Sequence, residues 1–459
     1  MSSSLFSCLS LSPATRANLE SLGYLEMTTI QAQSLPLILK GQDLIAQAKT
    51  GSGKTAAFGI GLLEALNPRF FGCQALVLCP TRELADQVAK ELRRLARAAD
   101  NIKILTLCGG VSIGPQIGSL EHGAHVIVGT PGRIQEHLRK GSLKLDGLNT
   151  LVLDEADRML DMGFYDSIAG VIGQTPSRRQ TLLFSATYPP GIQQLSAAFM
   201  RNPQRVEVES QHDDSQIEQR FYEISPEQRM DAVLRVLAAY RPESCVAFCF
   251  TKQQCQELVE VLTAAGISAS ALNGDLEQRD RDQVLAMFAN RSLSVLVATD
   301  VAARGLDIDA LDMVINVELA RDAEIHIHRV GRTGRAGAKG IAISLVAPAE
   351  GHRAQAIESL QKAALNWHPL SSLKPREGAP LQPPMATLCI ASGRKDKVRP
   401  GDILGALTGE AGIPGNRVGK IAIFDYQAFV AVERDIARQA LKRLSEGKIK
   451  GRSLKVRML

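Results

Sequence analysis

Two acidic residues, Asp154 and Glu155, stand directly after the apolar run Leu151–Leu153. Such a run is typical of a buried strand, so both carboxylates are expected to emerge at its carboxyl end. Ligands of open α/β sheets bind at that edge. Neighbouring carboxylates there could hold a Mg²⁺ ion and activate a water molecule. We therefore expect Asp154 to bind the metal and Glu155 to act as the general base.

A phosphate-binding loop is the second chemical feature. It spans Ala48–Thr55 and fits the pattern G-x-x-x-x-G-K-[ST], except that Ala48 replaces the first glycine. Gly51 and Gly53 still permit a tight turn whose N–H groups can face phosphate oxygens. In this pattern Lys54 contacts the β- and γ-phosphates and Thr55 the Mg²⁺, so ATP and Mg²⁺ are the expected cofactors. The expected nucleotide-binding residues of the loop are Ala48, Lys49, Thr50, Gly51, Ser52, Gly53, Lys54 and Thr55.

The elements that must position these residues alternate along the chain between strand-like and helical patterns. This alternation favours parallel sheets with helices on both faces. The strand-like runs of the first region include Ala75–Cys79, Val126–Val128, Leu151–Leu153 and Thr181–Phe184, with a helical pattern over Arg82–Ala98. Those of the second region are Ser244–Phe250, Val295–Ala298, Met313–Val317 and Ile341–Val346. The fold class is therefore α/β, with two tandem domains of which only the first has a phosphate loop.

Polar and proline-containing segments divide the chain into three domains. The expected order is a first domain at 1–208, a linker at 209–216, a second domain at 217–366, a linker at 367–384 and a small α+β domain at 385–459. The last domain has apolar runs at Thr387–Ile390, Ile421–Phe424 and Phe429–Val432, and one helical stretch at Arg434–Leu444.

Composition and charge narrow the class of protein. The chain has 459 residues, and it contains neither an apolar run long enough for a membrane span nor the start of a signal peptide, so we expect a cytoplasmic protein. Residues 385–459 hold 15 Lys and Arg against 7 Asp and Glu, a net charge of +8, whereas residues 1–384 carry −3. This asymmetry indicates a polyanion partner for the C-terminal domain.

Further motifs appear in the order of a known family. Ala48–Thr55 and Asp154-Glu-Ala-Asp157, together with the motifs below, resemble the DEAD-box family of RNA helicases. The matching residues are Phe6, Gln31 in Thr28–Gln31, Pro80–Leu84, Gly109-Gly110, Thr130–Arg133, Ser185–Thr187, Ala298–Asp307 and His328–Arg335.

The resemblance implies two RecA-like domains and a set of site residues. Phe6, Gln31 and Asp307 would bind the nucleotide, and the catalytic residues would be Lys54, Asp154, Glu155, Arg332 and Arg335. RNA contacts would come from Pro80, Thr81, Arg82, Gly110, Thr130, Pro131, Gly132, Arg133, Thr299 and Gly305. Small residues in these motifs suit backbone and hydroxyl contacts to phosphates, which position a strand without reading bases. Because the arginines and the phosphate loop lie in different domains, hydrolysis would require the domains to close.

Residues 385–459 resemble the C-terminal domain of one bacterial branch of this family, which is a variant RNA-recognition fold directed to a hairpin of 23S ribosomal RNA. Segments Met385–Ile390, Arg399–Thr408 and Gly447–Arg452 carry this likeness. Gln427 and Phe429 fall at the two positions where such sheets stack bases, so stacking should be weakened or displaced. The expected RNA contacts of this domain are basic instead: Arg394, Lys395, Lys397, Lys448, Lys450 and Arg452.

Together with the resemblance, these features predict an RNA-dependent ATPase that separates short 23S ribosomal RNA helices in 50S precursor particles. We expect a monomer, with no membrane and no DNA partner. Two alternatives remain: an ATP-gated RNA clamp that remodels RNA–protein contacts without strand separation, and a non-catalytic ribosomal RNA scaffold.

Overall fold

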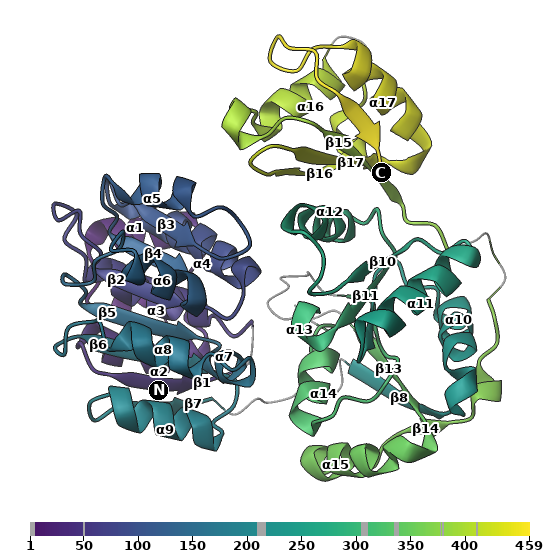
Figure 1. Cartoon of the computed structure of the whole chain (residues 1–459), viewed down its shortest axis with the longest axis horizontal. Coiled ribbons are helices and arrows are strands. Elements are labelled where there is room, and N and C mark those ends of the chain that lie inside the picture. The colour runs from purple at the N-terminus through teal and green to yellow at the C-terminus, as the bar shows by residue number, and fades with distance from the viewer. Residues whose placement is uncertain are drawn as a thin grey trace. The chain divides into compact units, whose positions relative to one another are not determined.

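The computed structural model describes residues 5–48, 51–208, 217–303, 311–334, 339–376, 378, 381–409 and 412–459. They form two compact units (Figure 1). The N-terminal α/β domain is one unit, and the second α/β domain together with the C-terminal domain is the other. Across these described ranges, no helix combines the length and apolarity needed to cross a membrane.

The described part of the first domain forms a seven-stranded parallel sheet with the order β3-β4-β2-β5-β6-β1-β7. Its strands are β1 Leu44–Gln47, β2 Ala75–Leu78, β3 Ile104–Leu107, β4 Val126–Gly129, β5 Thr150–Asp154, β6 Gln180–Ser185 and β7 Gln204–Glu207. Its helices are α1 Pro13–Ser21, α2 Thr29–Leu39, α3 Lys54–Glu64, α4 Arg82–Leu95, α5 Gly114–Leu120, α6 Pro131–Arg139, α7 Ala156–Asp161, α8 Tyr165–Ile172 and α9 Pro190–Phe199.

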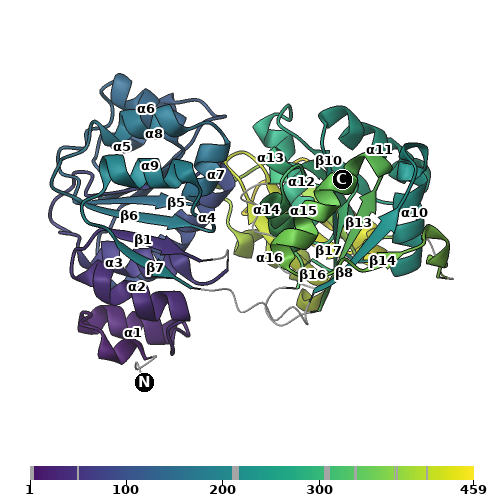
Figure 2. The same cartoon turned by 90° about the horizontal axis from the view of Figure 1, so that it is seen from below.

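Both faces of this sheet are buried, as the continuous apolar runs predict. Val152 of β5 belongs to one apolar cluster with Phe58 of α3, whereas Leu151 and Leu153 belong to a second cluster with Ile168 of α8. Successive side chains of a strand point to opposite faces, so helices must cover both sides of the sheet. Figure 2 shows α2 and α3 on one side of β1 and β6, and α8 and α9 on the other.

The described residues of the second domain repeat this architecture, with the strand order β10-β11-β9-β12-β13-β8-β14. Its strands are β8 Ile217–Glu223, β9 Cys245–Cys249, β10 Ala269–Leu272, β11 Val295–Thr299, β12 Met313–Asn316, β13 Gly340–Val346 and β14 Trp367–His368. Its helices are α10 Arg229–Tyr240, α11 Lys252–Ala264, α12 Gln278–Ala289, α13 Asp300–Ala303, α14 Ala323–Val330 and α15 Gly351–Gln361. The two tandem RecA-like domains expected from the sequence are confirmed.

The second sheet continues further along the chain than the sequence predicts. Strand β14 pairs in parallel with β8, and the Trp367 ring packs on Phe221 with the ring centroids 5.6 Å apart. Leu370 and Leu373 also pack against the core of this domain. The prediction that a linker begins at residue 367 is therefore wrong, because a two-residue strand leaves no apolar pattern to detect. The linker predicted at 209–216 lies outside the described residues.

The C-terminal domain is a four-stranded antiparallel sheet with the order β16-β17-β15-β18 and two helices. Its elements are β15 Met385–Ile390, α16 Pro400–Thr408, β16 Val418–Ile423, β17 Ala428–Glu433, α17 Ala437–Glu446 and β18 Val456–Met458. Leu388 and Val430 pack with Ile403 of α16 and Leu444 of α17. The alternate side chains of β15 and β17 therefore face away from the two helices.

Candidate functional site

One edge of the first sheet gathers the chemistry-bearing segments of the first domain. All the strands are parallel, so their carboxyl ends meet at the same edge. The neighbours β5, β6 and β1 lead into Asp154-Glu155, Ser185–Thr187 and the loop from Ala48, and the neighbours β3, β4 and β2 lead into Gly109-Gly110, Thr130–Arg133 and Pro80–Arg82. We call these the ATP half and the RNA half of the edge, after the roles expected from the sequence.

The phosphate loop ends in Lys54, the first residue of α3. The Lys54 side chain is 6% exposed, and its Nζ donates a hydrogen bond of 2.8 Å to the Ala48 carbonyl. This bond stretches the ammonium group back across the loop. Gly53 has a φ of +93°, and a Cβ there would lie 2.4 Å from Nε2 of Gln31. The loop therefore needs glycine at position 53, while Lys49 and Thr50 lie outside the described residues.

Gln31 is held against this loop from α2. Its Nε2 donates to the Gly53 carbonyl at 3.1 Å, and its Oε1 accepts from the Thr28 backbone N–H at 2.9 Å. Thr28 Oγ1 donates to the Ser52 carbonyl at 2.8 Å. The structure thus places Gln31 beside the phosphate loop, as its expected role requires.

Phe6, which the resemblance expects to bind the nucleotide, has a buried ring. It is 4% exposed, belongs to the apolar core, and packs edge-on against Tyr24 with the centroids 6.1 Å apart. The ring offers almost no free surface in this conformation, so stacking on adenine would need Phe6 to be uncovered.

Asp154 and Glu155 lie together at the carboxyl end of β5. Asp154 is 3% exposed, and this burial raises the pKa of its carboxyl to about 7, although Lys54 opposes the shift. The Glu155 backbone N–H donates to Asp154 Oδ1 at 3.1 Å. A buried carboxylate beside a phosphate loop suits Mg²⁺, which prefers carboxylate and phosphate oxygens. Glu155 adopts a φ of +52°, a left-handed conformation that non-glycine residues rarely hold without a local reason.

Asp157 joins two of the strand ends, and it is absent from the site residues expected from the sequence. Its Oδ2 accepts from the Ala186 N–H at 3.2 Å, the Thr187 N–H at 3.1 Å and Thr187 Oγ1 at 3.0 Å. Because Asp157 follows the acidic pair and Thr187 follows β6, this carboxylate ties the Ser185–Thr187 segment to the acidic strand end. The sequence signal that could have identified Asp157 is its place in the acidic motif Asp154-Glu-Ala-Asp157.

The RNA half contains two arginines, Arg133 and Arg82, with guanidinium nitrogens that lack a hydrogen-bond partner among the described residues. Arg133 donates to the Val111 carbonyl at 2.7 Å, a bond that joins the segments after β3 and β4, and it pairs with Glu136 of its own helix at 3.1 Å. Its third nitrogen, and two nitrogens of Arg82, are buried without a hydrogen-bond partner among the described residues. Buried donors normally find acceptors, so these groups suit an anion such as an RNA phosphate. Thr81 and Thr130 are the N-cap residues of α4 and α6, whose first N–H groups can also face phosphates.

In the second domain, Arg329 organises the region of the expected arginine motif. It is 2% exposed and forms a bidentate pair with Asp300 at 2.6 and 2.8 Å. It also donates to Asn316 Oδ1 at 3.1 Å and to the Glu318 carbonyl at 2.7 Å. Asp300 follows Thr299, so Arg329 connects an expected RNA contact with helix α14. Sequence reasoning did not single out Arg329.

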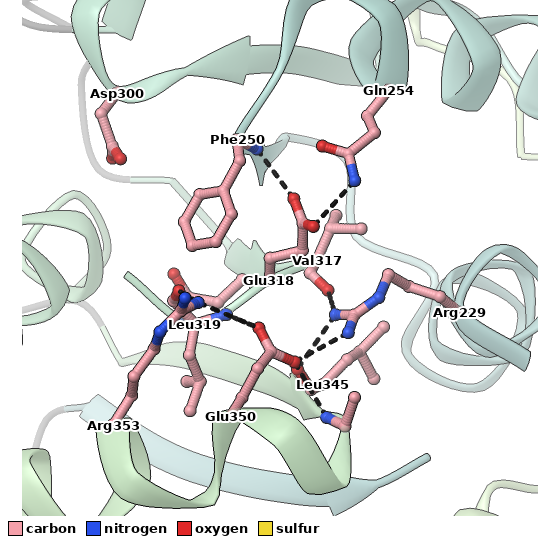
Figure 3. A network of polar contacts seen from close by, with 12 residues as sticks. Arg229, Phe250, Gln254, Asp300, Val317, Glu318, Leu319, Leu345, Glu350 and Arg353 are labelled. Carbon is pink, nitrogen blue, oxygen red and sulfur yellow. Dashed lines mark hydrogen bonds and ion pairs between the residues drawn. The ribbon is translucent and has the colours of Figure 1, made fainter. Parts of the chain in front are cut away.

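A second buried network fixes the segment between β12 and α14 (Figure 3). Glu318 accepts from the Phe250 N–H at 2.8 Å and from Gln254 at 2.7 Å. Glu350 pairs with Arg229 at 2.7 Å and accepts from the Leu319 N–H at 3.1 Å. These bonds join the carboxyl ends of β9, β12 and β13, so α14 starts from a rigid base. Arg332 follows α14 and is half-buried, whereas Gly305, Asp307 and Arg335 lie outside the described residues.

The two stacking positions of the C-terminal sheet are closed. Phe429 is fully buried and Gln427 is 5% exposed. Arg279 of α12 donates to Gln427 Oε1 at 3.1 Å, and Phe429 packs with Ala286 of the same helix. Neither side chain can stack on a base in this arrangement.

The basic residues of the C-terminal domain come together from two segments distant in sequence. Lys450 Nζ donates to the Lys397 carbonyl at 2.8 Å. We call the two segments, Arg394–Lys397 and Lys448–Arg452, the paired basic loops. The exposed basic side chains of the paired basic loops are Arg394, Lys395, Lys397, Lys448, Lys450 and Arg452. Asp396 is the acidic residue among them, and its pKa lies below the usual range, mainly because it accepts from the Gly393 N–H and Ser392, with Arg452 contributing.

Comparison with known proteins gives matches for all three domains. The DEAD/DEAH box helicase family matches residues 28–195, the helicase conserved C-terminal domain matches 228–337, and the DbpA RNA binding domain matches 387–458. The chain is 55% identical over 451 residues to the ATP-dependent RNA helicase DbpA of Escherichia coli (strain K12), which covers 98% of each chain.

Two further relatives cover the α/β domains. The DEAD-box ATP-dependent RNA helicase CshA of Geobacillus kaustophilus is 44% identical over 346 residues, covering 75% of this chain and 74% of that protein. The structure of S. cerevisiae Dbp5 bound to RNA and ADP BeF3 aligns with a TM-score of 0.74 and 30% identity, covering 80% of this chain and 96% of that one. The branch indicated by residues 385–459 is thus the one that includes DbpA.

Proposed function

The chain belongs to the DEAD-box family of ATP-dependent RNA helicases, and on this basis we propose that it locally unwinds 23S ribosomal RNA during assembly of the 50S subunit. The observation that carries the targeting is the pair of basic loops in a domain that matches the DbpA RNA binding domain. A sheet that cannot stack bases leaves these loops as the main contact surface for RNA.

The ATP half supports hydrolysis through groups that converge on the γ-phosphate. Lys54 and the arginines Arg332 and Arg335 would neutralise charge that develops in the transition state. Mg²⁺ held by Asp154 and Thr55 would supply further neutralisation when bound. Glu155 would orient the attacking water and accept its proton.

The RNA half and the second domain would hold the RNA backbone. The unpartnered nitrogens of Arg82 and Arg133 supply donors for phosphates, and Thr299 would add a contact from the second domain. Asp157 ties the Ala186–Thr187 segment to the acidic strand end, so these two segments of the ATP half would respond together to the state of the nucleotide.

The experiment compares RNA fragments in an ATPase assay on the full chain. A 23S ribosomal hairpin fragment should stimulate hydrolysis more than a random RNA of equal length. Changing Lys448, Lys450 and Arg452 together to Gln should remove this preference and reduce the salt slope of binding by about one unit for each lost phosphate contact.

A matched control changes Arg438 and Lys442 to Gln, which removes exposed charge from α17 of the same domain. This control should keep the preference for the ribosomal fragment. An equal preference in the parent and the triple variant would place specificity elsewhere and contradict the proposal. Strand separation of a duplex adjoining the fragment distinguishes an unwinding enzyme from a clamp.

A further inference from the structure

Tyr426 differs from the other aromatic residues of the C-terminal domain in being exposed. The domain has three aromatic residues, Phe424, Tyr426 and Phe429. The rings of Phe424 and Phe429 pack edge-on with their centroids 5.5 Å apart, and Phe429 is fully buried. Tyr426 is 72% exposed, the largest exposed fraction of any large apolar side chain among the described residues. A single exposed apolar side chain is ordinary on a protein surface, so its position must decide whether Tyr426 has a role.

Strand register brings Tyr426 to the edge of the sheet that carries the paired basic loops. One row of paired residues crosses the four strands in the order Ile423, Ala428, Ile390 and Val456. The first paired basic loop follows Ile390, and the second precedes Val456. Strands β16 and β17 are joined at the same edge by a tight hairpin loop, in which the Phe424 N–H donates to the Gln427 carbonyl at 2.8 Å. Tyr426 lies at the tip of this hairpin loop.

Backbone hydrogen bonds hold the hairpin loop against the first paired basic loop. The Arg394 N–H donates to the Phe424 carbonyl at 2.7 Å. The next residue, Lys395, donates its N–H to the Asp425 carbonyl at 2.9 Å. A Cβ at Gly393 would lie 2.2 Å from the Phe424 carbonyl oxygen, so glycine at this position permits the close approach. The exposed ring and the basic side chains therefore belong to one surface whose backbone is fixed.

We propose that Tyr426 is a base-stacking residue, on which an unpaired base of a bound RNA stacks while the neighbouring phosphates lie on the paired basic loops. Aromatic rings for bases and cations for phosphates are the two components of sites for unpaired RNA. Gln427 and Phe429 cannot supply the ring, because both are buried. The hydrogen-bonded hairpin loop holds its backbone in place before RNA binds, which lowers the ordering cost of binding. This assignment rests on the proposed function, which brings RNA to the paired basic loops.

The test measures the affinity of the full chain for the 23S hairpin fragment. Tyr426→Ala should weaken binding by roughly tenfold or more, as expected for the loss of one stacked base. Tyr426→Phe keeps the aromatic face and should bind within about twofold of the parent. Leu404→Ala is the matched control, because it removes another exposed apolar side chain of the same domain, and it should bind as the parent does. Parent-like binding by Tyr426→Ala, or an equal loss in Tyr426→Phe, would overturn the proposal.

The salt dependence of the affinity separates stacking from a contact to phosphate. An uncharged ring releases no counterions from RNA, so Tyr426→Ala should keep the parent's slope of log affinity against log salt concentration. Lys448→Gln should instead reduce this slope by about one unit. A reduced slope in Tyr426→Ala would show that the substitution disturbs the paired basic loops, which contradicts a stacking role.

A change in the RNA identifies the stacked base. Each loop nucleotide of the 23S fragment is replaced in turn by an abasic nucleotide. At one position the parent should lose affinity by about the factor that Tyr426→Ala causes, and combining both changes should cause no further loss. Additive losses at every position would refute stacking on Tyr426. A parent chain that binds the fragment and an unrelated hairpin equally would contradict the proposed target, but it would leave the Tyr426 comparison standing, because stacking tolerates any base.

Discussion

Replacing Asp157 by Ala should destabilise the first domain by about 2–4 kcal/mol. Its Oδ2 accepts two backbone N–H groups and one hydroxyl from Ala186 and Thr187, at 3.0–3.2 Å. A hydrogen bond to a charged group contributes about 1.5–3 kcal/mol, and stranding a buried donor costs about 1–3 kcal/mol. The expected destabilisation is less than the sum over the three hydrogen bonds, because their free energies are not additive. Ala186 and Thr187 are also half-buried, so water can replace part of the lost hydrogen bonding.

The control for this prediction lies on the same helix. Asp161 ends α7 and pairs with Arg158 at 3.3 Å, with 45% of its side chain exposed. Exposed ion pairs contribute about 0–1 kcal/mol, so Asp161→Ala should have a small effect. Asp157→Asn keeps an acceptor without the charge, and its effect should lie between those of the two alanine variants.

The assay must report the stability of the first domain separately from that of the other two domains. Hydrogen exchange of β5 and β6 peptides in increasing urea, read by mass spectrometry, reports the free energy of unfolding of the first sheet. The difference between Asp157→Ala and Asp161→Ala is the deciding quantity. Equal destabilisation by both substitutions would show that the Asp157 bonds contribute no more than a surface ion pair.

Three other predictions concern catalysis and pH. Glu155→Gln should keep ATP and RNA binding but hydrolyse ATP about 10²–10⁴-fold more slowly, and a rate within threefold of the parent would contradict a general base. Arg335→Ala should lose RNA-stimulated hydrolysis, about 10³–10⁵-fold for an arginine finger, while RNA affinity in a filter-binding assay stays unchanged. Burial lowers the pKa of His326 to about 3, so the unfolded chain binds more protons below pH 6.5 and the stability of the second domain should fall by about 1.4 kcal/mol per pH unit towards pH 3. Urea titrations at several pH values should show a weaker slope in His326→Gln and an unchanged slope in the exposed control His352→Gln.

Sequence patterns predicted the central strands well and the edge strands poorly. Leu151–Leu153 reads as a buried strand because a central parallel strand is apolar on both faces. Strand β7, at the edge, buries only Val206 of its four residues, and β14 has two residues in total. Such strands are held by pairing to a neighbour, which leaves no local pattern in the sequence.

The site residues divide in the same way. Lys54, Asp154 and Glu155 could be predicted because their chemistry depends on spacing within a short motif. The bonds of Asp157 to Thr187 and of Arg329 to Asp300 join distant segments, and nothing in the local sequence pairs them. The contact between α12 and the C-terminal sheet could not be predicted from the sequence either. Thr387 reads as an ordinary strand residue until Asn290 is placed beside it.

Strand order relates the expected site residues of the second domain to those of the first domain. The two sheets have matching orders, so β11 occupies the position of β4, and β12 occupies that of β5. Thr299 is the last residue of β11 and Thr130 directly follows β4, so the two threonines lie at equivalent places in their sheets. Helix α14 and Arg332 follow β12, the counterpart of the strand that ends in Asp154. Parallel strands carry their loops at one edge, so we expect position in the sheet, rather than order in the chain, to decide which ligand each segment contacts. The same reasoning predicts that Arg332 acts on ATP and Thr299 on RNA. A loss of RNA binding in Arg332→Ala, or of ATP binding in Thr299→Ala, would contradict it.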